Sequence, residues 1–253
     1  MSTTKITAMT TCKVEPMTGT TTMTLMGGTP FYDTTTKSLY YTDVICGQIF
    51  RLDTTTHQLT TAKILGETCI SFIVPCEGTT DQFIIGAGKR LLMITWDGIH
   101  TTAHITRVLT ELPFDGVRFT EGTTDTRGRL FCGTMLTEET GNTFDYTKRV
   151  GGLYRYTLEE GLVEIKTKIG KSTGITFNDK TNTCYHVDSY DLKITQFGYD
   201  VKTGTISGEK TLTDLTTFGT KTTCTPHGLT TDHEGNLYVT MNGGSKIIKV
   251  NTT

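Results

Sequence analysis

The segment from Arg118 to Met135 begins with an arginine and carries two acids and tight-turn glycines in a loop that runs into an apolar strand. The arginine and the acids are groups that could bind a polar ligand. Thr120, Thr123 and Thr124 stand where a binding loop would be expected to carry Asn, Asp or Lys. Taken by itself, Arg118 is best interpreted as a structural arginine paired with Asp125 or Glu121.

Other residues that could do chemistry are isolated. His227 follows a proline, as an ordinary turn histidine does, and Glu138 lies in a Thr-Glu-Glu-Thr stretch typical of a solvated loop. The remaining five histidines show no i,i+4 pairing, so they do not predict a separate zinc site. The chain has no Walker-type phosphate loop, no dinucleotide fingerprint and no nucleophile elbow.

Composition limits the class of protein. The formal net charge is −2 with acids and bases interspersed, which argues against a nucleic acid or an acidic membrane surface as partner. No apolar run approaches the length of a membrane span, and the first residues lack the apolar core of a secretory signal. Seven dispersed cysteines without a CxxC pair indicate reduced thiols. We therefore expect a cytoplasmic protein whose partner is a small molecule; the oligomeric state stays open.

The elements that must position these residues read as strands. Helical periodicity is nearly absent, whereas short apolar runs bounded by Gly, Asp, Asn and Thr recur. Five segments resemble one another, each an inner strand, a turn and a second strand: Ser38–Asp53, Gln82–Gly98, Arg129–Met135 with Gly151–Thr157, Thr183–Asp200 and Asn236–Val250. Their starts lie about 45 to 55 residues apart, the period of four-stranded propeller blades. Turn cues rich in Asp and Asn precede several of them.

The pattern predicts one all-β domain over residues 1–253. Because the fifth segment ends at Val250, a final blade of the propeller is expected to be incomplete in this chain, and an open blade leaves an unpaired edge. The stretch from Lys5 to Met17 could supply one outer strand of a closing blade.

Threonine makes up roughly a quarter of the chain, several times its average usage. It clusters at positions 20–22, 34–36 and 54–56, where turns normally carry Asn, Asp, Gly or Pro. Two origins stay open: a genuine drift of the composition, or replacement of other residue types by Thr.

Four segments together resemble the regucalcin/gluconolactonase family, which includes firefly luciferin-regenerating enzyme. They are Leu25–Asp43, Arg118–Met135, Ser172–Asp191 and Thr225–Val250, and they come in the order and spacing of that family. The resemblance implies a six-bladed β-propeller of four-stranded antiparallel blades. It also implies one divalent metal ion, bound by a Glu in a G-E-G-P loop, an Asn in an S-N-G loop and an Asp in a P-D-G loop. Such oxygen donors suit calcium, manganese or zinc.

Carried over by residue, the family's metal positions fall on Gly28, Thr173 and His227. None of the three keeps the family's residue, and the resemblance implies that His227 also stands at the position of the family's base. Among the substrate-holding positions, Arg118 and Glu138 match, whereas Thr120 replaces an Asn. The sequence as written therefore predicts part of a substrate-binding shell without an oxygen-rich metal cage.

Two functions follow from this resemblance. The first is a metal-dependent hydrolase of sugar lactones or related small esters, with a role of the luciferin-regenerating type included. The second is a non-catalytic propeller that binds a small ligand, with no metal. Whether the chain is an enzyme stays open at this point.

Overall fold

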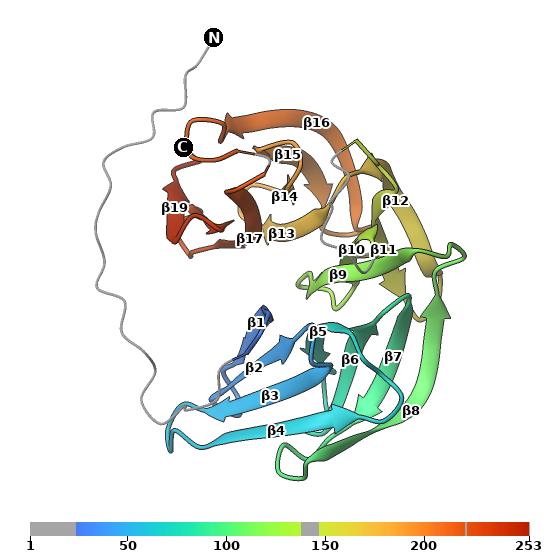
Figure 1. The fold of residues 1–253 in the computed structure, drawn as a ribbon. Helices are drawn as coiled ribbons and strands as arrows, with labels where there is room; N and C mark the ends of the chain where they lie inside the picture. The colour runs from blue at the N-terminus through green and yellow to red at the C-terminus, as the bar shows by residue number, and fades with distance from the viewer. Residues whose placement is uncertain (1–23, 138–146, 221, 253) are drawn as a thin grey trace. The chain divides into compact units, whose positions relative to one another are not determined.

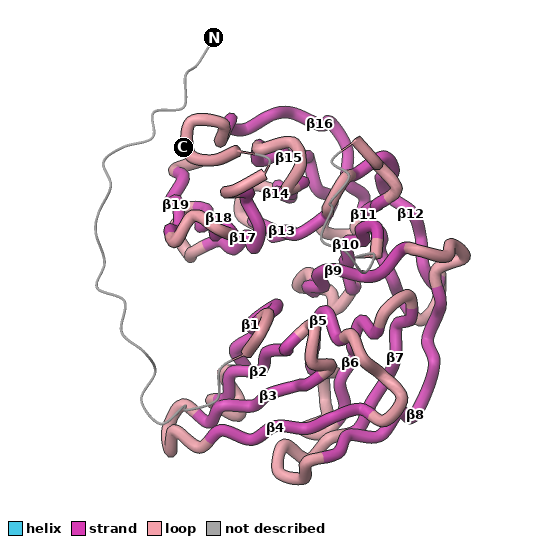
Figure 2. Tube along the Cα trace, viewed as in Figure 1, coloured by secondary structure: helices cyan, strands magenta, loops and turns pink. Residues whose placement is uncertain are grey.

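The computed structural model describes residues 24–137, 147–220 and 222–252, and nineteen strands lie within them (Figure 1). None of these residues lies in a helix, which confirms the all-β prediction (Figure 2). In the same ranges, no helix is long and apolar enough to cross a membrane. Within these ranges the chain divides into two compact units: an N-terminal unit of residues 24–122, and a C-terminal unit that begins at residue 123.

The N-terminal unit contains an eight-stranded sheet in the order β1-β2-β3-β4-β8-β7-β6-β5. It is made of two four-stranded antiparallel meanders, joined where β4 pairs with β8 in parallel. The strands are β1 (Gly27–Asp33), β2 (Ser38–Asp43), β3 (Gln48–Asp53), β4 (Leu59–Ile64), β5 (Ile70–Pro75), β6 (Gln82–Ala87), β7 (Arg90–Thr95) and β8 (Thr102–Glu111).

The C-terminal unit contains sheets in the orders β12-β11-β10-β9, β13-β14-β15-β16 and β17-β18-β19. Strand β9 begins in the N-terminal unit and ends in the C-terminal unit. The strands are β9 (Val117–Thr124), β10 (Leu130–Leu136), β11 (Gly151–Thr157), β12 (Gly161–Ile169), β13 (Ser172–Asn178), β14 (Thr183–Asp188), β15 (Lys193–Asp200), β16 (Thr205–Asp214), β17 (Thr225–Thr231), β18 (Leu237–Asn242) and β19 (Lys246–Val250).

The five similar segments of the sequence are the second and third strands of five successive meanders: β2–β3, β6–β7, β10–β11, β14–β15 and β18–β19. These central strands are apolar because they are mostly buried, as in β6 and β7. The fourth strands are largely exposed, as in β8 and β16, so their sequence signal is weak. Four meanders have four strands, and the fifth has three within the described residues.

The threonine-rich turns are built around aspartates. The Asp33 carboxylate accepts hydrogen bonds from Thr35 N (2.8 Å) and Thr36 Oγ1 (2.7 Å). Asp53 accepts from Thr55 N and Thr56 N, both at 2.8 Å. The left-handed positions of these turns are taken by Lys37 (φ 50°) and His57 (φ 60°), not by the β-branched threonines, for which positive φ is costly.

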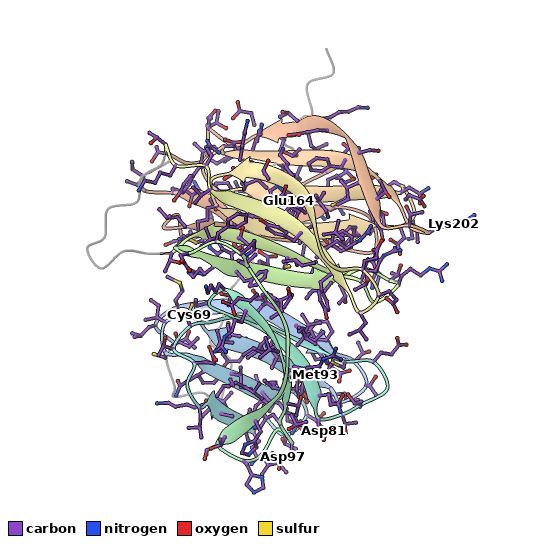
Figure 3. All side chains as sticks on the ribbon, turned by 90° about the vertical axis from the view of Figure 1, so that its right-hand side faces the viewer. Cys69, Asp81, Met93, Asp97, Glu164 and Lys202 are labelled. Atoms are coloured by element: carbon purple, nitrogen blue, oxygen red, sulfur yellow. The ribbon has the colours of Figure 1, made fainter. Side chains whose placement is uncertain are left out.

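Similar aspartate-centred turns recur between other strands. In the loop between β7 and β8, Asp97 accepts from Ile99 N and His100 N, and between β15 and β16 Asp200 accepts from Lys202 N; Asp97 and Lys202 are labelled in Figure 3. Side-chain acceptors of this kind satisfy main-chain N–H groups that a turn leaves without a ladder partner. The loops thereby start each strand in a fixed register.

The core of each unit lies between neighbouring meanders. In the N-terminal unit, buried side chains of both meanders pack together, among them Ile49, Ile73 and Leu92. In the C-terminal unit, one cluster includes Phe131, Leu153 and Ile175, and another includes Val187, Leu229 and Val239. Each cluster draws on neighbouring meanders, so the apolar faces of successive sheets cover one another.

Candidate functional site

Arg118 lies on β9 in the N-terminal unit and is only 6% exposed. Its Nη1 donates to the carbonyl oxygen of Phe119 at 3.0 Å and lies 3.5 Å from Ser71 Oγ. Ser71 Oγ in turn donates to the same Phe119 carbonyl at 2.5 Å. Burying a guanidinium is favourable only where its N–H groups find acceptors, so this cluster holds the cation in place.

Asp125 was one of the two acids expected to pair with Arg118. In the structure its carboxylate pairs with another arginine, Arg129. Asp125 Oδ2 accepts from Arg129 Nε at 2.7 Å and from Tyr199 Oη at 2.6 Å. Arg129 also donates to the carbonyls of Val201 and Lys202, which ties the start of β10 to the turn after β15. Asp125 and Arg129 are therefore structural residues of the C-terminal unit.

Gly28 lies on β1, half-buried, where the family has a glutamate. A Cβ at this position would meet Thr42 Oγ1 and Val44 Cγ2 at 2.9 Å each, and Ser71 O at 3.2 Å. Both obstructing side chains are β-branched and stiff at χ1. The structure thus places Gly28 beside Ser71, the residue that also contacts Arg118. With Thr42 and Val44 in their present positions, there is no space for a side chain at position 28.

Two predicted substrate-holding positions remain. Thr120 follows Arg118 by two residues on β9 and is half-buried, so the two side chains lie on the same face of the strand. Glu138 lies outside the described residues.

In the C-terminal unit, the structure brings Thr173 and His227 together. The Ser189 hydroxyl donates to the Pro226 carbonyl at 2.7 Å, which uses its single proton, so the Thr173 hydroxyl donates to Ser189 Oγ at 2.7 Å. A Cβ on Gly174 would lie only 2.7 Å from the His227 carbonyl oxygen. Thr173 and Ser189 are fully buried, whereas His227 on β17 is half-buried.

The Ser172–His186 pair lies next to Thr173, and sequence patterns did not identify it. Ser172 Oγ and His186 Nε2 are 2.8 Å apart, and both residues are 2% exposed. Burial lowers the pKa of His186 to about 3, and the charge of Lys166 adds to this effect. Ser189 was also missed, because the acids of the stretch Asp188–Asp191 suggested only a turn. The family's S-N-G pattern includes Ser172 but does not point to His186, which lies 14 residues further on, and no short-range motif marks Ser189, whose Pro226 partner is 37 residues away.

The donor set does not fit a divalent metal ion. Gly28 offers no side-chain ligand, and Thr173 offers only a neutral hydroxyl, whose proton is donated to Ser189. Across the described ranges there is no group of three or more His, Cys, Asp or Glu side chains able to hold a metal ion. Oxygen-rich sites for calcium or manganese need several such ligands.

Comparison with known proteins identifies the family. The model of the SMP-30/Gluconolactonase/LRE-like region matches residues 26–253. Regucalcin of Danio rerio is 24% identical over 225 residues, which cover 89% of this chain and 70% of the relative. Regucalcin of Gallus gallus is 24% identical over 227 residues, which cover 89% of this chain and 71% of the relative.

Solved structures share the fold. Luciferin-regenerating enzyme superposes with a TM-score of 0.81 at 24% identity, covering 90% of this chain and 73% of that one. A calcium-binding protein, regucalcin, from Agrobacterium tumefaciens gives 0.71 at 18% identity, covering 86% and 68%. The strand-rich sheets agree with a β-propeller fold. The chain belongs to the SMP-30/gluconolactonase/LRE-like family.

Proposed function

We propose that this protein recognises small lactones, of the sugar-lactone kind, and hydrolyses them to hydroxy acids. The family supports a role like that of a sugar-lactone hydrolase. The observation that carries the proposal is Arg118, the family's substrate-holding arginine, which is buried and anchored to Phe119 O and Ser71 Oγ. A fixed guanidinium suits lactone and carboxylate oxygens, because its planar N–H groups match them.

Metal dependence does not follow from this chain as written, because the residues at Gly28, Thr173 and His227 do not make a metal site. The proposed reaction therefore uses water and protein side chains only. In the proposed reaction, water adds to the lactone carbonyl, the ring C–O bond breaks, the ring oxygen takes up one proton to become a hydroxyl, and a hydroxycarboxylate and one proton result. His227, at the family's base position, would accept the proton of the attacking water as a neutral imidazole.

Binding without turnover is the second candidate. It is favoured by the Thr173–Ser189–Pro226 chain, in which the hydroxyl at a family ligand position is committed to the protein itself. In this candidate, Arg118 of the N-terminal unit would still recognise a sugar acid. In both candidates the partner is a small molecule and not a nucleic acid.

The experiment compares hydrolysis of glucono-1,5-lactone in a pH-stat with its spontaneous rate, first in chelator and then with calcium, zinc or manganese. Calorimetry with gluconate measures binding separately. Arg118→Met and His227→Gln test the two named residues, and Arg107→Met, an exposed arginine on β8, is the matched control.

Four outcomes are possible, and each decides about the candidates. Turnover in chelator that His227→Gln abolishes supports metal-free hydrolysis. Gluconate binding that Arg118→Met abolishes, with lactone loss at the spontaneous rate, supports the binding role. Turnover that needs added metal would contradict the ligand assignment, and neither binding nor turnover would refute both candidates.

Finer features of the fold are part of the same proposal. We propose that the meanders are blades of a single six-bladed propeller and that the protein works in the cytoplasm. Small-angle scattering of the purified protein, compared with the luciferin-regenerating enzyme, tests the blade arrangement. A cell-fractionation experiment tests the compartment.

A further inference from the structure

Asp188 ends β14 and collects main-chain N–H groups around it. Its Oδ1 accepts from Lys171 N and Tyr190 N, each at 3.0 Å, and its Oδ2 accepts from Gly170 N at 2.9 Å. Asp43, at the end of β2, does the same with Leu25 N, Met26 N and Cys46 N. The two aspartates occupy equivalent places, since Ser172 pairs with Asp188 as Gly27 pairs with Asp43.

Asp188 also forms an ion pair with Arg149, and Asp43 has no such arginine partner among the described residues. Its Nη1 lies 2.7 Å from Asp188 Oδ2, and its Nη2 lies 2.7 Å from Asp191 Oδ1, so one guanidinium bridges two carboxylates. The Asp188 side chain is only 8% exposed, and the Arg149 side chain is 29% exposed. Because Asp43 keeps the same three main-chain donors with no arginine among its partners in the described residues, the turn itself does not require an arginine.

The residue after Asp188 leads into the candidate site. Ser189 N donates to Lys171 O at 2.9 Å, and its hydroxyl contacts Thr173 and the Pro226 carbonyl. A shift of the Asp188 turn would therefore move the hydroxyl that holds both Thr173 and the backbone before His227. Bidentate arginine–carboxylate contacts fix orientation as well as distance, which is what such a relay needs.

We propose that Arg149 is a positioning residue, which fixes Thr173 and the Pro226–His227 backbone through Asp188 and Ser189. The positioning role of Arg149 does not depend on the proposed function, whereas its consequence for turnover rests on that function. Arg149 contacts neither Thr173 nor His227 in the described interactions, so its effect on them is indirect.

The test combines hydrogen exchange with kinetics. Arg149→Met removes the charge, and Arg149→Lys keeps it but cannot bridge two carboxylates with a planar fork. Asp191→Asn weakens one half of the bridge at a half-exposed residue, which covers the case in which Arg149→Met fails to fold. Arg155→Met is the control: Arg155 lies on β11, which begins two residues after Arg149, pairs with Glu160 at 2.6 Å and donates to Thr203 O at 2.9 Å.

Exchange is read at residues 225–229, which Arg149 does not touch. We expect Arg149→Met to speed their exchange roughly tenfold, Arg149→Lys to do so less, and Arg155→Met to leave it unchanged. If wild-type protein hydrolyses lactone, kcat falls about 10- to 100-fold in Arg149→Met while KM stays within about threefold.

Two results would overturn the proposal. Faster exchange confined to residues 188–191 would make Arg149 a local brace of its own turn. An equal change at 225–229 in Arg155→Met would make the effect one of general stability. Absence of wild-type turnover would refute hydrolysis alone, because the exchange measurement decides the positioning role without a substrate.

Discussion

The first and fourth meanders each contain one of the family's metal-ligand positions, at equivalent places in the sheet. The residues around these two positions differ. Gly28 on β1 and Thr173 on β13 each follow the residue paired with an anchoring aspartate, Asp43 or Asp188. The residue after the first aspartate is Val44, whose methyl group crowds Gly28. The residue after the second is Ser189, whose hydroxyl bonds Thr173.

This difference shows two ways in which a ligand position can be closed. In the first meander, apolar and β-branched atoms occupy the space that a side chain would need. In the fourth meander, a side chain is present, but its one hydroxyl proton is committed to the neighbouring Ser189 hydroxyl. The first closure is steric and the second is chemical, so substitutions should separate them.

The largest effect is expected at Gly174, which follows Thr173. A Cβ there would lie 2.7 Å from both His227 O and Leu229 Cβ. A main-chain carbonyl of a paired strand cannot rotate away, so we expect Gly174→Ala to lower the free energy of unfolding by about 3 kcal/mol. Urea denaturation measures it, and Gly198→Ala, where the nearest atom is 3.5 Å away, is the matched control. A loss as small as that of the control would show that β13 and β17 can separate.

A second effect concerns pH and the Ser172–His186 pair behind Thr173. The first meander has Gly27 and Tyr41 at the matching places. Burial lowers the pKa of His186 from 6.5 to about 3, so below pH 6.5 the unfolded chain binds a proton that the folded chain excludes. Stability is therefore lost as pH falls through this window, by about 2 kcal/mol between pH 7 and pH 5.

His186→Gln should remove that loss, since the amide still offers Ser172 a hydrogen-bond partner but does not titrate. The measurement is the difference in unfolding free energy between pH 7 and pH 5, for wild type and variant. His104→Gln, at an exposed histidine of β8, is the control and should behave like wild type. Equal slopes for wild type and His186→Gln would mean that the buried imidazole is protonated in the folded state.

The sequence predicted the architecture better than the site. Central strands such as β6 and β7 are buried and apolar, so their pattern is visible locally, and the repeat of five such pairs indicated the meanders. The exposed strand β8 carries little pattern. Ser71 and Ser189 were not predicted, because what makes them important is a carbonyl 48 or 37 residues away in the sequence.

The steric closure at Gly28 is tested by adding one carbon. We expect Gly28→Ala to cost about 1–2 kcal/mol of unfolding free energy, less than Gly174→Ala, because side chains and not a carbonyl stand closest. In the Val44→Ala background, where one obstructing methyl is gone, the added cost of Gly28→Ala should fall to about half. An unchanged cost in that background would place the obstruction at Thr42 or Ser71 instead. A glutamate restored at position 28 therefore needs Val44 shortened as well.

The chemical closure at Thr173 gives the smallest effect, and a double-mutant cycle isolates it. Thr173→Val and Ser189→Ala each leave a buried group without its partner, so each should destabilise, and the pair should be less harmful than the sum. We expect a coupling energy of about 1 kcal/mol, because the 2.7 Å hydroxyl contact is fully buried. The same cycle on Thr176 and Thr231, whose hydroxyls are 3.3 Å apart and part-buried, should give a coupling near zero. Equal couplings in the two cycles would mean that Ser189 does not hold Thr173. The position of Thr173 would then not be closed chemically, and only the steric closure at Gly28 would remain.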